Sequence, residues 1–291
     1  MAGIAAGGAR RSKWAPWALS APALIWLVLF FVVPLYTLFT TSLSVNVGSV
    51  FVPELEMRWQ LSNYTDAFRE YGDILLRSFR YAGAATIFAL ILAYPLAYTL
   101  AFKAGKWKNA LLGLVILPFF VTFLVRTLAW KTIFDDSGWV VSFFDTIGLL
   151  PSEGRLLSTS WAVIGGLTYN FLPFMILPIY VSLERIDPRL MEASRDLYST
   201  GRRTFLKILL PLSLPGVFAG SLLTFIPASG DFINAQYLGG VNQSMIGSVI
   251  QSKFLIVKDY PTAAALSFVL MLLILAGVLA YTRALGTEDL K

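Results

Sequence analysis

The chain has 291 residues, of which 57% are hydrophobic and 14% are charged, whereas soluble domains carry roughly 45–50% apolar and about 25% charged residues. Cysteine and histidine are both absent, which excludes disulfides, thiol nucleophiles, histidine metal sites and imidazole catalysis. The net charge of +6 does not indicate nucleic-acid binding, because most basic residues lie in short segments between apolar runs, where they orient a membrane protein.

The N-terminal region begins with three basic residues, Arg10, Arg11 and Lys13, followed by an apolar run. This arrangement superficially resembles a signal peptide. The uncharged stretch from Trp14 to Pro53 is too long for one, and no small-residue cleavage site interrupts it early. We therefore expect a cytoplasmic tail at residues 1–16 and an uncleaved first span.

Six segments satisfy the requirement for a transmembrane helix, which is about 20 apolar residues for a hydrocarbon core of ~30 Å. They centre on residues 21–43, 81–102, 109–130, 161–183, 208–230 and 262–282. The predicted fold class is an all-α integral membrane protein with six transmembrane helices. We expect one domain at residues 17–285 and a C-terminal tail at 286–291. Prolines in nearly every span predict kinked helices.

Two further uncharged stretches are not predicted to span. Residues 137–144 are too short and are expected to lie at the membrane interface. Residues 232–252 are long enough, but their asparagines, glutamines and glycines are too polar for lipid contact. We interpret that stretch as an outer loop, with partial re-entry into the membrane as the alternative.

The third predicted span carries one charge, Arg126, near its end. A long cationic side chain at such a position can extend to the interface or pair with a nearby acid. We expect Arg126 to do one of these, with Asp135 or Asp136 as the partner. The tryptophans cluster near the ends of the spans, which is typical of an interfacial belt.

Orientation follows from the placement of lysine and arginine, which concentrate on the cytoplasmic side. Most basic residues precede the first span or follow the second, fourth and sixth spans, whereas most acidic residues lie in the other connections. This distribution predicts that both termini are cytoplasmic, which requires an even number of spans.

The loop at residues 184–207, between the fourth and fifth spans, is the most informative segment. Asp187 can cap a helix whose first residue is Pro188. Leu190, Ala193 and Leu197 then recur at helical spacing. The pattern predicts a short amphipathic helix on the cytoplasmic side. From the pattern alone it is either an ordinary surface helix or an element that a soluble partner grips.

A resemblance to a known family becomes specific at these residues. Glu192-Ala193-Ser194, followed by Ile208, Leu210 and Pro211, match the EAA motif of binding-protein-dependent ABC importer permeases, Glu-Ala-Ala and then Ile-x-Leu-Pro at a fixed distance. Ser194 replaces an alanine of the motif, and Tyr198 stands where the family has a glycine. Gly201, three residues later, is expected to supply the flexibility instead.

The similarity continues through residues 210–220, 225–232 and 238–240, and includes residues 22–27 and 30–34. These segments resemble permeases of the spermidine/putrescine type. The resemblance implies the MetI-like ABC importer permease fold in the bacterial inner membrane and, as solute, a polyamine. Importers of opines, iron, sulfate or amino-phosphonates share much of the scaffold and remain alternatives.

The resemblance also implies partners: a second homologous permease, a dimer of ATPase subunits and an extracytoplasmic solute-binding protein. In such transporters the helix with the EAA motif, here including Ser194, docks on the ATPase. We expect Glu192, Arg195 and Asp196 to make polar contacts there, and Ala193 and Leu197 to form the packed face. The chain has no P-loop motif, so ATP and Mg are expected on the ATPase, and no cofactor in this chain.

A polycation pathway should offer carboxylates and aromatic faces. Asp231, at the outer end of the fifth span, is the main candidate, with Tyr169, Asn170 and Asn234 as further ones. The alternatives are an interfacial residue in an outer loop for Asp231 and ordinary hydrogen bonds between helices for the others.

Two other classes of protein fit the sequence less well. A secondary carrier or channel would also have kinked spans, but it leaves the EAA-like motif unexplained. A membrane enzyme would need clustered catalytic groups, and the Asp135-Asp136 pair has no matching partner motif.

Overall fold

The computed structural model describes residues 15–49, 53–148 and 155–284. The predicted tails at 1–16 and 286–291 lie outside these ranges, apart from Ala15 and Pro16. The described elements are α1 (Ala15–Leu27), the π-helical η1 (Val28–Val32), α2 (Val33–Ser42), β1 (Ser44–Asn46), β2 (Leu55–Met57), α3 (Ser62–Phe102), η2 (Gly105–Trp107), α4 (Lys108–Ile116), η3 (Leu117–Phe120), α5 (Phe123–Ile133), α6 (Trp139–Thr146), α7 (Ser160–Glu184), α8 (Arg189–Asp196), α9 (Gly201–Thr204), the π-helical η4 (Phe205–Leu209), α10 (Leu210–Ser229), α11 (Ile233–Leu238), η5 (Val241–Gln243), α12 (Ile246–Gln251), the π-helical η6 (Ser252–Val257) and α13 (Tyr260–Ala284).

Within the described ranges, five helices are long and apolar enough to cross a membrane: Ser20–Ser42, Ser62–Phe102, Ser160–Glu184, Gly201–Ser229 and Tyr260–Arg283. A sixth span results if the helix pair Gly105–Phe120 and Phe123–Ile133, which is bent by 95°, counts as one. The prediction of a helical membrane protein is confirmed.

The third predicted span differs from the expectation of one continuous helix. The 3₁₀ turn η3 contains Pro118, and the chain is extended at Val121 and Thr122. Proline lacks a backbone N–H and its ring clashes with the preceding turn, so the helical hydrogen bonds stop there. The helix resumes as α5 in a new direction, which places α5 against α11 and α7.

The second span is part of a much longer helix than predicted. α3 has 41 residues and begins at Ser62, whereas the apolar window placed the span near residues 81–102. At 1.5 Å per residue such a helix is about 60 Å long, twice the hydrocarbon thickness. Its buried residues recur at helical spacing from Ala67 through Leu75 and Ala82 to Leu100, so the apolar stripe continues beyond the membrane-spanning part.

The core lies between α3, α7 and α10. Alanines of α3 that are 0% exposed, among them Ala85, Ala89 and Ala93, let α7 approach closely. Gly216 of α10 serves the same purpose, because a Cβ there would lie 2.5 Å from the backbone oxygen of Pro178 in α7. Inside α7, Pro173 and Pro178 are accommodated without breaking the helix.

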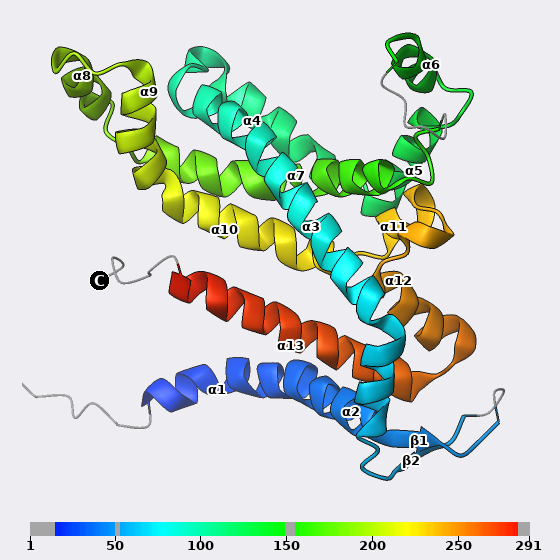
Figure 1. Cartoon of the computed structure of the whole chain (residues 1–291). Coiled ribbons are helices and arrows are strands. Elements are labelled where there is room, and N and C mark those ends of the chain that lie inside the picture. Colours follow the sequence, from blue (N-terminus) through cyan, green and yellow to red (C-terminus); the bar gives the residue numbers. More distant parts are fainter. Residues whose placement is uncertain (1–14, 50–52, 149–154, 285–291) are drawn as a thin grey trace, which may run out of the picture.

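The two ends of the molecule carry different elements (Figure 1). α1 begins and α13 ends at the same end as α8, whereas α6, α11, α12 and the β1–β2 hairpin lie at the other end. This arrangement agrees with the predicted sidedness, in which the N- and C-terminal ends share a side with the 184–207 loop.

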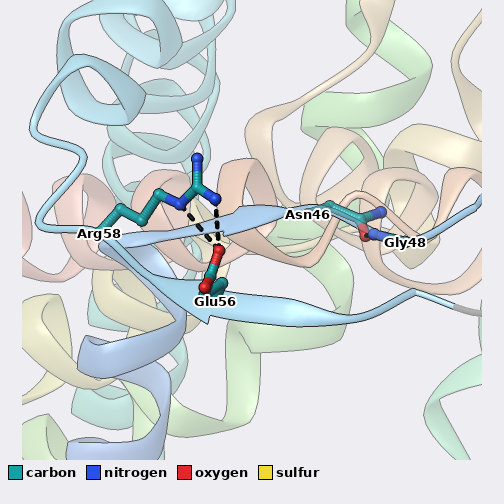
Figure 2. A network of polar contacts seen from close by, with 4 residues as sticks. All are labelled: Asn46, Gly48, Glu56 and Arg58. Atoms are coloured by element: carbon teal, nitrogen blue, oxygen red, sulfur yellow. Dashed lines mark hydrogen bonds and ion pairs between the residues drawn. The ribbon is translucent and has the colours of Figure 1, made fainter.

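The β1–β2 hairpin was not predicted. It is antiparallel, with Val45 opposite Glu56, and an exposed ion pair of 2.5 Å joins Glu56 to Arg58 beside it (Figure 2). Asn63 of α3 holds its base, because its side-chain amide donates to the backbone oxygens of Ser42 and Ser44.

The two stretches that were not expected to span are short helices. α6 covers most of residues 137–144 and exposes Trp139 and Phe143. Residues 232–252 form α11, η5, α12 and the first residue of η6, and none of these helices is long enough to cross a membrane. α11 packs on α5 and α7, which buries Asn234 and leaves Gln236 exposed.

Candidate functional site

The helix α8 forms where the sequence predicted it. The Asp187 carboxylate accepts the backbone N–H of Arg189 at 2.9 Å, as expected of a capping side chain, but the helix starts at Arg189 rather than at the predicted Pro188. Pro188 lies at the N-cap with a helical φ of −55°. Glu192 lies in the first turn and Arg195 in the last, each next to the helix end whose partial charge it complements.

One side of α8 is anchored and the rest is exposed. The Ser194 hydroxyl is 5% exposed and hydrogen bonds with the Thr204 hydroxyl at 2.7 Å, and Met191 packs against the buried residues of the core. The other candidate coupling residues, Glu192, Ala193, Arg195, Asp196 and Leu197, are all exposed. Ser194 therefore fixes α8 to its own chain, and the remaining five form a surface that nothing in the described chain covers.

The C-terminus of α8 differs from the expectation for Gly201. Tyr198 itself adopts the left-handed conformation, with φ 55°, and Gly201 begins α9 without a positive φ. The Tyr198 N–H donates to the Arg195 oxygen at 2.9 Å, and the Ser199 N–H donates to the Ser194 oxygen at 3.0 Å, which is a Schellman motif. An L-residue in this conformation costs about 1–2 kcal/mol, and glycine avoids that cost.

A continuous helical path joins this region to the fifth span. α9, η4 and α10 run without interruption from Gly201 to Ser229. At the start of the path Phe205 meets the Tyr94 ring edge-on at 5.3 Å, and the Tyr94 hydroxyl hydrogen bonds with Ser213 at 2.8 Å. Direct contacts thereby connect this helical path to α3.

A buried polar cluster at the other end of the molecule connects three helices. The Asn170 amide donates to the Asn234 side-chain oxygen at 3.0 Å and to the Thr127 hydroxyl at 3.1 Å, and the Thr127 hydroxyl donates to Asn234 at 3.3 Å. All three side chains are 0% exposed. The cluster joins α5, α7 and α11. Sequence reasoning selected Asn170 and Asn234 but missed Thr127, whose hydroxyl gave no distinguishing signal.

Arg126 was expected to reach the interface or to pair with Asp135 or Asp136, and this expectation was wrong. The side chain is 8% exposed and lies against the Phe123 ring, 5.5 Å from its centroid, and near the Asn170 backbone oxygen at 3.5 Å. Asp136 instead pairs with Arg155 at 3.4 Å, and Asp135 accepts from Ser137. The turn at residues 121–122 redirects α5 toward α7 and α11, which brings Arg126 under protein.

The other two pathway candidates lie in different surroundings. Asp231 is 8% exposed, follows α10 after Gly230, and accepts the Asn234 backbone N–H at 2.7 Å. Burial raises the pKa of Asp231 to about 6, against the opposing effect of this hydrogen bond. Tyr169 is 36% exposed and meets the Trp130 ring edge-on at 5.2 Å. Asn234 thus connects Asp231 to Asn170, whereas Tyr169 takes part in none of these hydrogen bonds.

An ion pair at the inner end of the bundle escaped the sequence analysis. Lys108, the first residue of α4, pairs with Glu184, the last residue of α7, and lies 5.4 Å from the Tyr180 ring centroid. It fixes the start of the bent span to α7, next to the loop that carries α8. Within the described ranges, no group of three or more acidic side chains could hold a metal ion.

Comparison with known proteins gives consistent results. A family profile described as binding-protein-dependent transport system inner membrane component matches residues 1–283. The spermidine/putrescine transport system permease protein PotB of Escherichia coli strain K12 is 38% identical over 260 residues, which cover 89% of this chain and 94% of that protein. PotB of Haemophilus influenzae is 36% identical over 260 residues, covering 89% and 90%.

The fold is similar to that of a solved membrane transporter. A chain of the bacterial alginate ABC transporter in complex with an alginate pentasaccharide-bound periplasmic protein superposes with a TM-score of 0.71, covering 93% of each chain at 16% identity.

Proposed function

Because this chain belongs to the family of binding-protein-dependent transport system inner membrane components, we propose that it is the permease subunit of an ATP-driven polyamine importer. It is a multi-pass protein of the inner membrane and not the catalytic subunit of its transporter. Identity of 36–38% to PotB proteins over 89% of the chain supports spermidine or putrescine as the solute.

The observation that carries the mechanism is the exposed surface of α8, formed by Glu192, Ala193, Arg195, Asp196 and Leu197. Charged and apolar side chains lie together there without partners in the described chain, as expected of an interface. We propose that a dimer of ATPase subunits binds this surface, that a second homologous permease completes the pathway, and that an extracytoplasmic binding protein delivers the solute.

The coupling works through rigid contacts. The hydrogen bond between Ser194 and Thr204 fixes α8 to the start of the α9–η4–α10 helix, so that a force on α8 moves the fifth span as one body. Nucleotide binding brings the two ATPase subunits together and stabilises one orientation of the spans over the other. Hydrolysis removes that difference, which gives the transport its direction.

The outer end of α10 is the proposed entrance for the cation. Asp231 offers a carboxylate beside the polar side chains of Asn170 and Asn234, and Tyr169 with Trp130 offers aromatic faces. An ammonium group binds a carboxylate by charge and an aromatic face by cation–π attraction of roughly 0.5–2 kcal/mol. These contacts suit a solute with several amino groups separated by methylene chains.

The solute is tested by transport in proteoliposomes. The importer, purified with its binding protein, is expected to take up labelled spermidine only when ATP is present in the compartment that holds the ATPase. Excess putrescine should compete, and excess sulfate or iron should not. ATP-dependent uptake of sulfate or an opine without spermidine uptake would overturn the polyamine assignment and leave the transporter class unchanged.

A further inference from the structure

Tyr198 places a large, exposed side chain at a backbone position that favours glycine. Its backbone adopts a left-handed conformation, φ 55°, that favours glycine, and its side chain is 96% exposed. Among the described residues, the ring has no aromatic contact, hydrogen bond or packing partner. The fold therefore gives no contact that compensates for placing a large side chain at this position.

The surroundings of Tyr198 indicate what its ring could contact. Leu197, next to it, is 80% exposed, so the end of α8 presents two adjacent large side chains. Arg195, Arg202 and Arg203 are exposed on the neighbouring turns. These three arginines outnumber the exposed acids of α8, Glu192 and Asp196, so the surface around the two large side chains is complementary to an apolar pocket with an acidic rim.

We propose that Tyr198 is the anchor with which α8 binds the ATPase subunit, its ring entering an apolar pocket lined at the mouth by carboxylates. This inference rests on the proposed function. Tyrosine is enriched among the few residues that dominate protein interfaces, because its rigid ring buries a large area at a low entropic cost.

The ATPase is favoured over the membrane surface as the occupant. Figure 1 shows α8 beyond the inner ends of α7 and α10, on the face that carries the ends of α1 and α13. The exposed surface around Tyr198 carries both signs of charge, because Glu192 and Asp196 lie beside the three arginines, and such a mixture matches a protein surface better than a uniformly anionic lipid surface. The test must therefore distinguish binding of the ring to the ATPase from contact of the ring with lipid.

The test measures chain stability and ATPase affinity in the same variants. The ATPase that co-purifies with the wild-type chain, identified by its ATP hydrolysis, is titrated onto the full-length permease complex in lipid nanodiscs. For Tyr198→Gly we expect equal or higher thermal stability, because glycine suits the left-handed turn, together with a rise of about tenfold or more in Kd. Tyr198→Phe keeps the ring and should change Kd by less than about threefold.

Trp59→Gly is the matched control. Trp59 has φ 51° and is 67% exposed, but it lies beside the hairpin at the opposite end of the molecule. The control removes an exposed aromatic ring from a left-handed residue without touching α8, so Kd should not change. An unchanged Kd for Tyr198→Gly, or an equal rise for Trp59→Gly, would overturn the proposal.

A label at the same position distinguishes the ATPase from lipid. Because the chain has no cysteine, Tyr198→Cys can be labelled selectively with a fluorophore. Iodide should quench the label in the permease nanodisc and should quench it much less once the ATPase is added at a concentration well above the raised Kd. Protection before the ATPase is added would show lipid contact and contradict the inference. If no ATPase co-purifies with the wild-type chain, the proposed function itself fails, which is a distinct result.

Discussion

Asn234 illustrates how one residue serves two parts of the structure. Its backbone N–H is accepted by the Asp231 carboxylate, and its side chain accepts from Asn170 and Thr127. The loop after α10, the bent span and α7 are therefore held to one another by buried hydrogen bonds, each worth on the order of 1 kcal/mol. The cluster is connected to the end of α10 through Asp231.

Arg126 shows where a residue-level expectation failed. The position of a charge near the end of an apolar segment predicted an interfacial side chain, but that inference assumed a straight helix. The turn after Pro118 changes the direction of α5, so that Arg126 lies 8% exposed against Asn170 and Phe123. Its Nε has no hydrogen-bond partner within the described chain. A sequence window cannot reveal a three-dimensional turn of this kind.

The charge of Asp231 is testable through pH. With a pKa of about 6, the carboxyl is mostly ionised at about pH 7.5 and mostly protonated at about pH 5, so its attraction for a cation is lost as pH falls through 6. Wild-type spermidine uptake should therefore fall over that range. Asp231→Asn should be about fivefold slower at about pH 7.5, because about 1 kcal/mol of attraction is lost.

The same variant is expected to fold, since asparagine also accepts a backbone N–H at such a turn. Its uptake should lack the step near pH 6. Equal uptake by Asp231→Asn and the wild type at every pH would remove Asp231 from the pathway.

At the scale of elements, the sequence predicted the helices whose signals lie in consecutive residues. The cap by Asp187 and the amphipathic spacing predicted α8 to within one residue, and the apolar windows located α7 and α13. The length of α3 was missed because its outer half carries charges, which an apolar window rejects although its buried face continues. The hairpin was missed because its strands have three residues each and little alternation.

The cluster of Thr127, Asn170 and Asn234 could not be predicted from neighbouring residues in the sequence. Its members are separated by 43 and 64 positions along the sequence. The sequence identified two of them as polar residues in or near spans, which leaves hydrogen bonding and solute contact equally open. The bend that brings Thr127 to them is a tertiary feature.

The contact between α10 and α7 predicts a large effect of one glycine. A Cβ at Gly216 would meet the Pro178 backbone oxygen at 2.5 Å, and backbone cannot move aside easily. Gly216→Val should therefore separate the helices and lower the free energy of unfolding by about 1–3 kcal/mol. Thermal unfolding followed by tryptophan fluorescence in detergent measures this.

Gly113 of α4 provides the comparison, because a Cβ there would meet nothing within 4 Å. Gly113→Ala should be neutral or stabilising by up to about 1 kcal/mol, since alanine is the better helix former. Comparable losses in both variants would show that the close approach of α10 to α7 is not the cause.

At the scale of the whole molecule, the sidedness of the chain is a further prediction. The absence of cysteine allows single replacements to be labelled by a membrane-impermeant maleimide. Ser199→Cys, at the end of α8, should react only in inside-out vesicles, and Val47→Cys, next to the hairpin, only in right-side-out vesicles. The reverse pattern would place α8 on the wrong side for an ATPase.

The central claim is that α8 is the surface through which an ATPase drives the spans, and retention of the ATPase tests it most directly. Glu192→Arg reverses a charge on the exposed face of α8, and Glu56→Arg makes the same change on the exposed hairpin at the other end. We expect the purified complex to lose its ATPase in Glu192→Arg and to keep it in Glu56→Arg, while both chains insert normally. Full retention of the ATPase by Glu192→Arg would contradict the account.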